Sequence, residues 1–395
     1  MTATPKAHGM QGDLVPPDWP PLTLAEVRSL LAQYPGLAEP IQILTVSPRP
    51  FSAAGVVATS GGQVFVKRHH RSIRDAEGLL EEHRFLLHLL FHRAPVPRVL
   101  AANSGQTAIE QGDWTYEVHE VPTGIDLYQD AISWTPFRTA AHAHAAARAL
   151  AQLHRASEGF AAPRRQPRPL VAGFSIFAAN DPAAAMESYL AARPALATHP
   201  AIRACAAQAL ELLAPFHAQL LPLLPALPPL WTHNDLHASN LLWSSDSPVA
   251  RATAIIDFGL ADRTCAVHDL AQAIERNIVE WLVLVSDPAH PNDVPVHTDH
   301  LHALLDGYES IRPLSTAEAS ALAPMAALCH AEFALSEADY YIAVLHSESN
   351  ARLAYDDYLT GHARWFHSSA GQSLLRSIQQ WATTRTHAPT KAEAL

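Results

Sequence analysis

The stretch Trp231–Trp243, WTHNDLHASNLLW, places four polar residues of interest, an acid, an amide and two imidazoles, between apolar segments. Within it, Asp235 lies between His233 and His237, and Asn240 follows the carboxylate by five positions (240 − 235 = 5). The residues LLPLLPALPPLW before the loop and LLW after it are of the kind that folded proteins bury. We therefore expect the four polar residues to be held in place at the floor of a cleft.

A second motif lies downstream, where TAIIDFG contains Asp257, Phe258 and Gly259. Between the two motifs, LLW and TAII read as short strands joined by the polar turn SSDSP. Because paired strands lie about 5 Å apart, we expect Asn240 and Asp257 to meet at one end of this hairpin, facing Asp235. An amide and a carboxylate next to an acid suit Mg²⁺, which takes few protein oxygens and fills its shell with phosphate and water.

The lysine content singles out one further residue. Of 27 basic residues only Lys6, Lys67 and Lys391 are lysines, and the first and last of these lie near the chain termini. Lys67 falls on QVFVKRH, the third of three short segments that read as strands. A compact ammonium differs from a planar guanidinium in reach and geometry, so a lysine kept here indicates a specific contact.

The pattern along the chain predicts a sheet-bearing region followed by a helical one. Residues 1–20 read as a flexible tail, and 21–121 as a small lobe with a capped helix at Thr23, strands, one main helix and a hairpin turning at Gly112–Asp113. Residues 122–385 read as a larger, mostly helical lobe, and 386–395 as a C-terminal tail. This order predicts an α+β fold in two lobes.

Composition argues against several other classes of protein. The net charge of −11 disfavours a nucleic-acid surface, which needs clustered Lys and Arg. We find no run of 18 apolar residues and no signal-peptide pattern at the N-terminus, so we expect neither a membrane span nor secretion. The three cysteines form no CxxC pair, and we expect a reduced, cytoplasmic protein.

Together the motifs resemble the aminoglycoside phosphotransferase and choline kinase superfamily. The pattern H-x-D-L-x-x-x-N matches His233 to Asn240, and D-F-G matches Asp257 to Gly259, with a strand lysine and a helix glutamate ahead of them. HNDLHASNLLW, AIIDFGLADRTCAVHDLA and ARALAQLHRA are closest to the bacterial phosphotransferase-enzyme group that includes homoserine kinase type II. The resemblance covers residues 41–285 and implies a protein-kinase-like fold with ATP between the lobes.

The resemblance also implies a role for each matching residue. These roles are acceptance of the substrate's hydroxyl proton by Asp235, Mg²⁺ binding by Asn240 and Asp257, phosphate contact by Lys67, pairing of Glu82 (or Glu81) with Lys67, and support of the loop by His233 and Asp269. Without the resemblance, Asp235 and Asn240 could instead cap turns, and Asp269 could cap the helix that follows it.

Three departures from ordinary protein kinases are visible. No G-x-G-x-x-G loop is present, and only Gly55 lies in the turn PRPFSAAGVV. Asn234 stands where an arginine would read an activation-loop phosphate, and no A-P-E follows Gly259. We therefore favour a small-molecule acceptor over a Ser/Thr protein kinase, and a non-catalytic nucleotide-binding regulator remains a third alternative.

The acceptor is expected to lie against a late helix, AEFALSEADYYIAV. The residues proposed for the pocket are His237 from the loop, although a histidine there is more often an ordinary loop residue, and Glu332, Asp339 and Tyr340, which share much of one helix face. Acids there suit a cationic acceptor such as an amino alcohol or an aminoglycoside. The alternative is a solvated acidic face, or pairing of these acids with Arg352.

Overall fold

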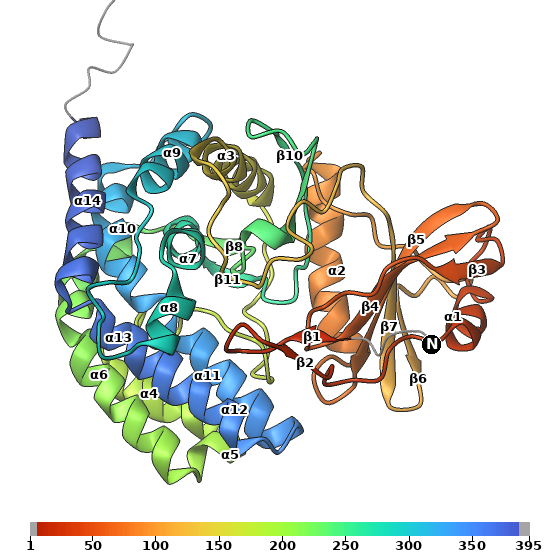
Figure 1. Cartoon of the computed structure of the whole chain (residues 1–395), viewed down its shortest axis with the longest axis horizontal. Coiled ribbons are helices and arrows are strands. Elements are labelled where there is room, and N and C mark those ends of the chain that lie inside the picture. The colour runs from red at the N-terminus through yellow and green to blue at the C-terminus, as the bar shows by residue number, and fades with distance from the viewer. Residues whose placement is uncertain (1–5, 387–395) are drawn as a thin grey trace, which may run out of the picture.

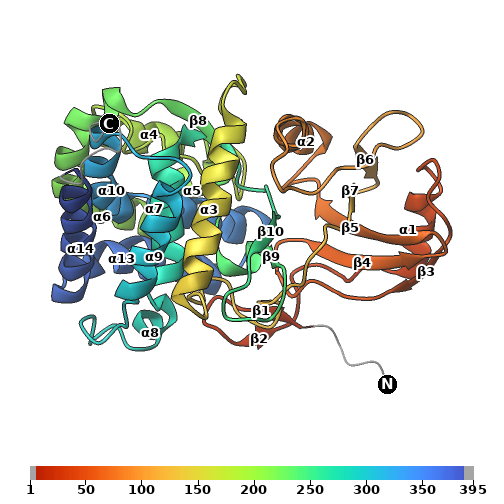
Figure 2. The ribbon, with the colours of Figure 1, turned by 90° about the horizontal axis from the view of Figure 1, so that it is seen from above.

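The computed structural model describes residues 6–386 and has two lobes (Figures 1 and 2). The smaller lobe carries an antiparallel sheet, and the larger lobe is built mainly of helices. The α+β, two-lobed organisation expected from the sequence is confirmed, with α2 as the main helix of the small lobe.

The small lobe is built on a five-stranded sheet in the order β3-β4-β5-β7-β6. Its elements are α1 (Leu24–Leu31), β3 (Pro40–Ile43), β4 (Ala53–Thr59), β5 (Gly62–His70), α2 (Ala76–Phe91), β6 (Ala108–Gln111) and β7 (Trp114–Glu120). Val66 and Val118 pack with α1 on one face of the sheet. Since side chains alternate along a strand, Lys67 and its cross-strand neighbour Glu117 face the other way.

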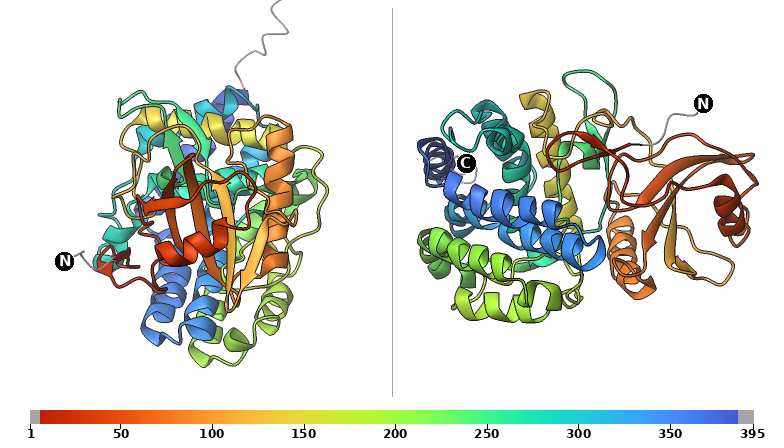
Figure 3. Two further views of the ribbon diagram at one scale, coloured as in Figure 1. Left: turned by 90° about the vertical axis from the view of Figure 1, so that its right-hand side faces the viewer. Right: turned by 60° about the horizontal axis from the view of Figure 1, so that its bottom comes forward.

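The large lobe surrounds one central helix. Its helices are α3 (Ala140–Ser157), α4 (Pro182–Ala191), α5 (Pro194–Ala197), α6 (Pro200–Leu220), α7 (Ala266–Ile278), α8 (Trp281–Ser286), α9 (Thr298–Glu309), α10 (Thr316–Leu328), α11 (Ala331–Asp339), α12 (Glu348–Arg352), α13 (His362–Trp365) and α14 (Ser369–Thr386), with 3₁₀ turns η1 (Leu221–Ala226) and η2 (Ala238–Asn240) and π-helical turns η3 (Tyr340–Val344) and η4 (Leu353–Gly361). Every residue of α7 is buried, so this helix forms the centre of the lobe. Figure 3 (right) shows the stacked helices of the large lobe beside the sheet of the small lobe.

Two short strand pairs place the opening motif within this helical lobe. The predicted hairpin is present as β9 (Leu241–Trp243) paired with β10 (Ala252–Ile255). A second antiparallel pair, β8 (Pro229–Thr232) with β11 (Asp262–Cys265), was not predicted. Both pairs flank the loop after β8, so they bring the two polar motifs of the sequence side by side.

Residues 6–20 correct one expectation, because they are not a flexible tail. They form the hairpin β1 (Ala7–His8) and β2 (Leu14–Val15), which lies between the lobes in Figure 1. The Tyr358 hydroxyl donates to the carbonyl of Met10, and the Tyr340 hydroxyl donates to Asp18 at 2.9 Å. These partners lie more than 300 residues away along the chain, so no local pattern could reveal them. Residues 1–5 and 387–395, the latter within the predicted C-terminal tail, lie outside the described residues.

The segment Pro200–Ala226 is long and apolar enough, by length and composition alone, to cross a membrane. In the structure its buried positions Ile202, Ala209 and Leu213 belong to the main hydrophobic core, and α6 packs against α10. A core helix of a helical lobe has the same composition, and the segment also contains Pro215 and Pro225.

Candidate active site

A cavity between the lobes gathers the polar motifs of the sequence. It encloses about 1110 Å³, part of it open to solvent. Its charged and polar lining comprises His8, Arg49, Lys67, His69, Arg74, Asp235, His237, Asn240, Asp257, Arg276 and Glu337, and its aromatic lining comprises Phe51, Trp134, Phe333, Tyr341 and Tyr358. Lys67, Asp235, His237, Asn240 and Asp257, which the sequence predicted to lie together, all reach this space.

Asp269 holds the loop after β8 in place from the first turn of α7. Its carboxylate accepts the backbone N–H of His233 at 2.8 Å and that of Asn234 at 2.9 Å, and His154 Nε2 lies 2.9 Å from Oδ2. His233 in turn donates from Nε2 to the carbonyl of Ile256 at 3.0 Å. Asp269 and His233 are both fully buried. These contacts agree with the predicted supporting roles of the two residues.

Asn234 explains how the loop turns toward the cavity. Its φ of 59° lies in the left-handed region, which asparagine tolerates better than most residues. Its side-chain oxygen accepts from the hydroxyls of Thr232 at 2.8 Å and Thr264 at 3.2 Å. The side chain is therefore tied into the core of the lobe, so that Asp235 faces the cavity.

Asp235 lies partly buried at the floor of the cavity, where Asn240 and Arg276 contact it. Asn240 Nδ2 donates to the Asp235 carbonyl at 2.9 Å and to Oδ2 at 3.2 Å, and Arg276 Nε lies 3.3 Å from Oδ1. Burial raises the pKa of Asp235 to about 6, although the Arg276 charge opposes this shift. Such a carboxyl is poised to take up a proton near neutral pH, as a general base must.

Asp257 is the strongly ionised partner in the site. Burial opposes its ionisation, but the Lys67 ammonium at 2.9 Å outweighs this and lowers the pKa of the Asp257 carboxyl. Lys67 contacts Oδ1 of Asp257, so Oδ2 of Asp257 is available to a metal ion. The amide nitrogen of Asn240 donates to Asp235, so the amide oxygen of Asn240 is also available. The donor set of Asn240 and Asp257 therefore fits a hard cation such as Mg²⁺.

The predicted pairing of Lys67 with Glu82 is wrong in this structure, and so is the alternative with Glu81. Glu82 Oε1 accepts from Arg74 Nε at 2.9 Å and from Arg165 Nη2 at 2.8 Å, whereas Glu81 contacts Arg165 Nε at 3.2 Å. The Glu82 carboxylate therefore pairs with two buried guanidinium groups and not with Lys67. Glu82 does lie close enough to raise the pKa of Lys67, together with the nearer Asp257.

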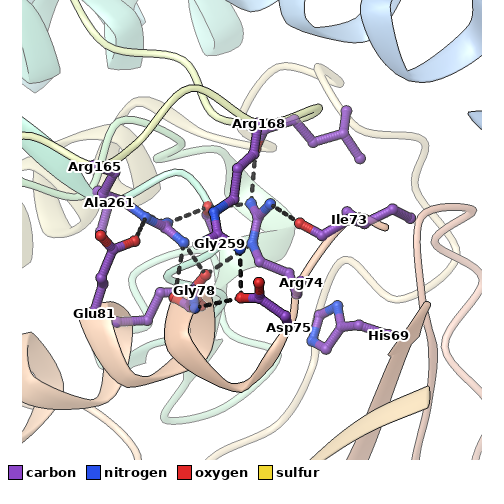
Figure 4. A network of polar contacts seen from close by, with 12 residues as sticks. His69, Ile73, Arg74, Asp75, Gly78, Glu81, Arg165, Arg168, Gly259 and Ala261 are labelled. Carbon is purple, nitrogen blue, oxygen red and sulfur yellow. Dashed lines mark hydrogen bonds and ion pairs between the residues drawn. The ribbon is translucent and has the colours of Figure 1, made fainter. Parts of the chain in front are cut away.

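Arg74 and Arg165 form a network that sequence reasoning missed (Figure 4). Arg74 donates to the carbonyls of Leu170 at 2.7 Å and Gly259 at 2.6 Å, and Arg165 donates to Gly259 at 2.9 Å. Figure 4 shows both guanidinium groups between α2 and the loop that carries Gly259. Arginine is abundant in this chain, so its frequency did not single out Arg74 or Arg165.

The predicted acceptor face of the late helix is also wrong. The Glu332 carboxylate accepts the backbone N–H groups of Gly173 and Ile176, the latter at 2.7 Å. Asp339 lies 3.8 Å from Arg193, and Tyr340 bonds to Asp18. None of these three side chains lines the cavity. Glu332 faces the loop after α3, Asp339 faces Arg193 at the end of α4, and Tyr340 faces the N-terminal segment. The alternative pairing with Arg352 is not seen either, since Arg352 lies 3.8 Å from Asp356.

The cavity instead receives the neighbouring face of the same helix. Phe333, Glu337 and Tyr341 repeat every four residues and line it together. Glu337 Oε2 is buried and has no hydrogen-bond partner among the described residues, and burial raises the pKa of Glu337 to about 8. An unpartnered carboxyl beside aromatic rings is a position where a cationic ligand can be recognised.

Arg49 is a second cavity residue that the sequence did not single out. It lies in the turn between β3 and β4, where a glycine-rich loop would otherwise be expected. Nη1 donates to Ser133 Oγ at 3.0 Å and lies 3.0 Å from His8 Nδ1, and Nη2 donates to the carbonyl of Ala131 at 3.2 Å. Arg49 therefore joins three segments around the cavity and adds a positive charge to it.

This arrangement defines a class of protein. Two lobes with a partly buried carboxylate, an amide, a second carboxylate and a strand lysine gathered between them form the site of a kinase-type phosphotransferase. The phosphotransferase enzyme family matches residues 53–314, more than half of the chain, and the chain belongs to this family. The family resemblance and the enzyme class expected from the sequence, a phosphotransferase with an alcohol group as acceptor, are confirmed.

Solved structures with related folds lie at low sequence identity. An aminoglycoside phosphotransferase from Alicyclobacillus acidocaldarius is 19% identical, with 93% of this chain and 98% of that chain covered and a TM-score of 0.50. A microcompartment-associated aminopropanol kinase is 18% identical, with 88% of this chain and 99% of that chain covered and a TM-score of 0.56. The amicoumacin kinase hAmiN, solved with AMP-PNP and Ca²⁺, is 13% identical, with 86% of this chain and 92% of that chain covered and a TM-score of 0.55. These likenesses support the kinase-like fold, and no curated protein sequence matches the chain.

Proposed function

We propose that the protein transfers the γ-phosphate of ATP to a hydroxyl of a small cationic molecule, such as an amino alcohol, a homoserine-like compound or an aminoglycoside. The observation that carries this proposal is the cavity between the lobes, which Asp235, Lys67 and Asp257 line together with Glu337, whose Oε2 has no hydrogen-bond partner among the described residues. An aminopropanol kinase and aminoglycoside phosphotransferases among the related folds act on acceptors of this kind.

Each residue has a defined task in the proposed reaction. The acceptor oxygen attacks the γ-phosphorus while Asp235 takes the hydroxyl proton, and the bond from the γ-phosphorus to the bridging oxygen breaks, so that ADP leaves. Lys67 moves its contact from Asp257 to the α- and β-phosphates. Asn240 and Asp257 are the residues that would hold Mg²⁺, which offsets phosphate charge when bound.

The acceptor is held by the opposite wall of the cavity in this proposal. An acceptor ammonium would satisfy Glu337 Oε2 and favour its ionised form, and the Tyr341 ring would contact the cation, whereas the Arg276 guanidinium already lies 4.2 Å from the centroid of the Phe333 ring. Arg49 would contribute positive charge near the phosphates, in place of the missing glycine-rich loop. A protein substrate is disfavoured, because the cavity is walled by the N-terminal hairpin.

The test is ADP release from Mg-ATP over a panel of acceptors: choline, homoserine, neutral sugars and aminoglycosides. We expect turnover with a cationic hydroxyl compound in the wild type and its loss in Asp235→Asn. Turnover with neutral sugars alone would refute the cationic acceptor. If no acceptor supports turnover while radiolabel from ATP enters protein bands of a lysate, the protein-kinase alternative replaces the proposal. ATP binding without either transfer would favour a non-catalytic regulator.

A further inference from the structure

A cluster of three histidines and one glutamate lies behind the phosphate-binding lysine. The Glu117 carboxylate on β7 is 3.0 Å from His69 Nε2, 3.0 Å from His83 Nε2 and 2.8 Å from His119 Nε2. All four side chains are at most 10% exposed. They come from three elements, β5, α2 and β7, yet direct their nitrogen atoms at one carboxylate.

The spacing of these atoms matches a metal centre. The candidate ligand atoms of His83, Glu117 and His119 all lie within 4.8 Å of one another. Ligands of a tetrahedral Zn²⁺ ion, bound at about 2.0–2.1 Å, are separated by about 3.3 Å, so small side-chain rotations suffice. His69 Nε2 lies 3.0 Å from the other oxygen of Glu117, outside this group of three atoms, and its ring would have to turn toward the ion to supply a fourth ligand. Three imidazoles and one carboxylate suit Zn²⁺ or a similar transition metal rather than Mg²⁺.

The surroundings provide the outer contacts and the access that a metal site needs. His83 Nδ1 lies 2.8 Å from the hydroxyl of Thr107, which can fix the ring as second-shell partners of metal-bound histidines do. His119 Nδ1 is buried and has no hydrogen-bond partner among the described residues. His83 and Thr107 also line a separate cavity between α2 and the segment that precedes β6, which gives an ion a route inward.

We propose that His69, His83, Glu117 and His119 form a zinc-type metal site that fastens α2 to the sheet of the small lobe. The site is distinct from the oxygen-donor pair Asn240 and Asp257 in the cavity. Because Glu117 lies opposite Lys67 in the strand register, a metal bound there fixes the strand that presents the lysine. The site is independent of which acceptor the enzyme phosphorylates.

The test is metal retention by the full-length protein. Wild type is stripped with a chelator, incubated with Zn²⁺, dialysed and analysed for metal by atomic emission. His119→Gln removes one imidazole ligand while keeping an N–H donor for Glu117, and His92→Ala removes an exposed surface histidine at the end of α2 as the matched control. We expect wild type and His92→Ala to retain one more equivalent of zinc per chain than His119→Gln. Equal retention by all three proteins, or none by wild type, would overturn the proposal.

A second measurement needs no variant. Co²⁺ replaces Zn²⁺ at nitrogen and oxygen sites and reports its geometry by visible absorption. We expect wild type loaded with one equivalent of Co²⁺ to give the intense bands of a four-coordinate ion, abolished by added Zn²⁺. A weak six-coordinate spectrum that Zn²⁺ does not change would show surface binding only and would also overturn the proposal.

Discussion

At the scale of single residues, the neighbours of Asp235 and Asp257 shift the pKa values of these two cavity carboxyl groups in opposite directions. Asp257 has the Lys67 ammonium at 2.9 Å and stays ionised, whereas Asp235 is partly buried with a more distant Arg276 and has a pKa raised to about 6. This difference supports the proposed roles of Asp235 as the proton acceptor and of Asp257 as a permanently ionised partner that could hold a metal.

The first prediction concerns the role of Asp235. Asp235→Asn removes the proton acceptor while keeping the shape of the side chain, so kcat should fall on the order of 10²–10⁴-fold. ATP should still raise the melting temperature, because the phosphate-binding residues are intact. Steady-state ADP release and thermal shift check both parts. A kcat within threefold of wild type would remove Asp235 from the mechanism.

The raised pKa of Asp235 gives a second prediction, on pH. The ionised form is the one that accepts a proton, and its fraction falls as the pH drops through about 6. The value of kcat/KM should therefore decline about tenfold per pH unit below that point. Asp339→Asn is a matched control, because burial also raises the pKa of Asp339 to about 6 outside the cavity. If Asp339→Asn abolished the acidic limb, a conformational titration would explain it instead.

The third prediction is that the Glu337 carboxyl lowers the free energy of unfolding of the wild type at neutral and higher pH. Burial raises the pKa of Glu337 from 4.5 in the unfolded chain to about 8 in the folded protein. As the pH rises from 4.5 to 8, the unfolded state loses this proton before the folded state does. The free energy of unfolding of the wild type therefore falls over this range. Glu337→Gln lacks this loss and should gain about 3–4 kcal/mol relative to wild type between pH 5 and 8. Urea unfolding at both pH values measures it.

The same variant should raise KM for a cationic acceptor by about 10-fold or more, since it removes a charged contact of about 1.5–3 kcal/mol. The KM for ATP should not change. An acceptor KM equal to that of wild type would show that Glu337 does not contact the acceptor.

At the scale of elements, helix α2 is joined to the large lobe by buried charges. Glu82 forms ion pairs with both Arg74 and Arg165, and these arginines also donate to the carbonyl of Gly259. Glu82 thereby links the small lobe to the segment that follows Asp257. Removing one member of such a network leaves buried charges without compensation, which costs about 3–5 kcal/mol.

We therefore predict that Glu82→Gln lowers the unfolding free energy by about 3–5 kcal/mol. Glu81→Gln serves as the control, because Glu81 is more exposed and contacts Arg165 only at 3.2 Å. Its effect should stay below about 1 kcal/mol. Urea unfolding of the two variants compares them directly. Equal losses would mean that the arginines find other partners when Glu82 is neutral.

At the scale of the whole molecule, the N-terminal hairpin closes one side of the cavity. His8, Gly9 and Met10 line it, and Tyr358, which also lines it, bonds to Met10. The first and last parts of the chain thus meet at the site where chemistry is proposed.

Deletion of residues 1–15 should raise the acceptor KM by about 10-fold or more, since each 1.4 kcal/mol of lost contact is a factor of ten. ATP binding should persist, because Lys67, Asn240 and Asp257 belong to other elements. Initial-rate kinetics and an ATP thermal shift separate the two effects. An unchanged acceptor KM would show that the hairpin does not contact the bound acceptor.

Local sequence patterns were sufficient to predict much of this protein. The capping box of Thr23 and Glu26, the hairpin of β6 and β7, and the hairpin of β9 and β10 depend on residues near each other in sequence, so their spacing identified them. The two polar motifs and the strand lysine likewise predicted which side chains would meet in the cavity.

Only the tertiary structure decided which partners those side chains have. The contact of Lys67 with Asp257 rather than Glu82 depends on Arg165, which lies 83 residues from Glu82 along the chain. The cavity-facing side of the late helix is Phe333–Glu337–Tyr341 because Glu332 is used by backbone N–H groups of a distant loop. The physical reason is that helical spacing fixes which residues share a face, whereas the packing of distant segments fixes which face is buried and which charges are compensated.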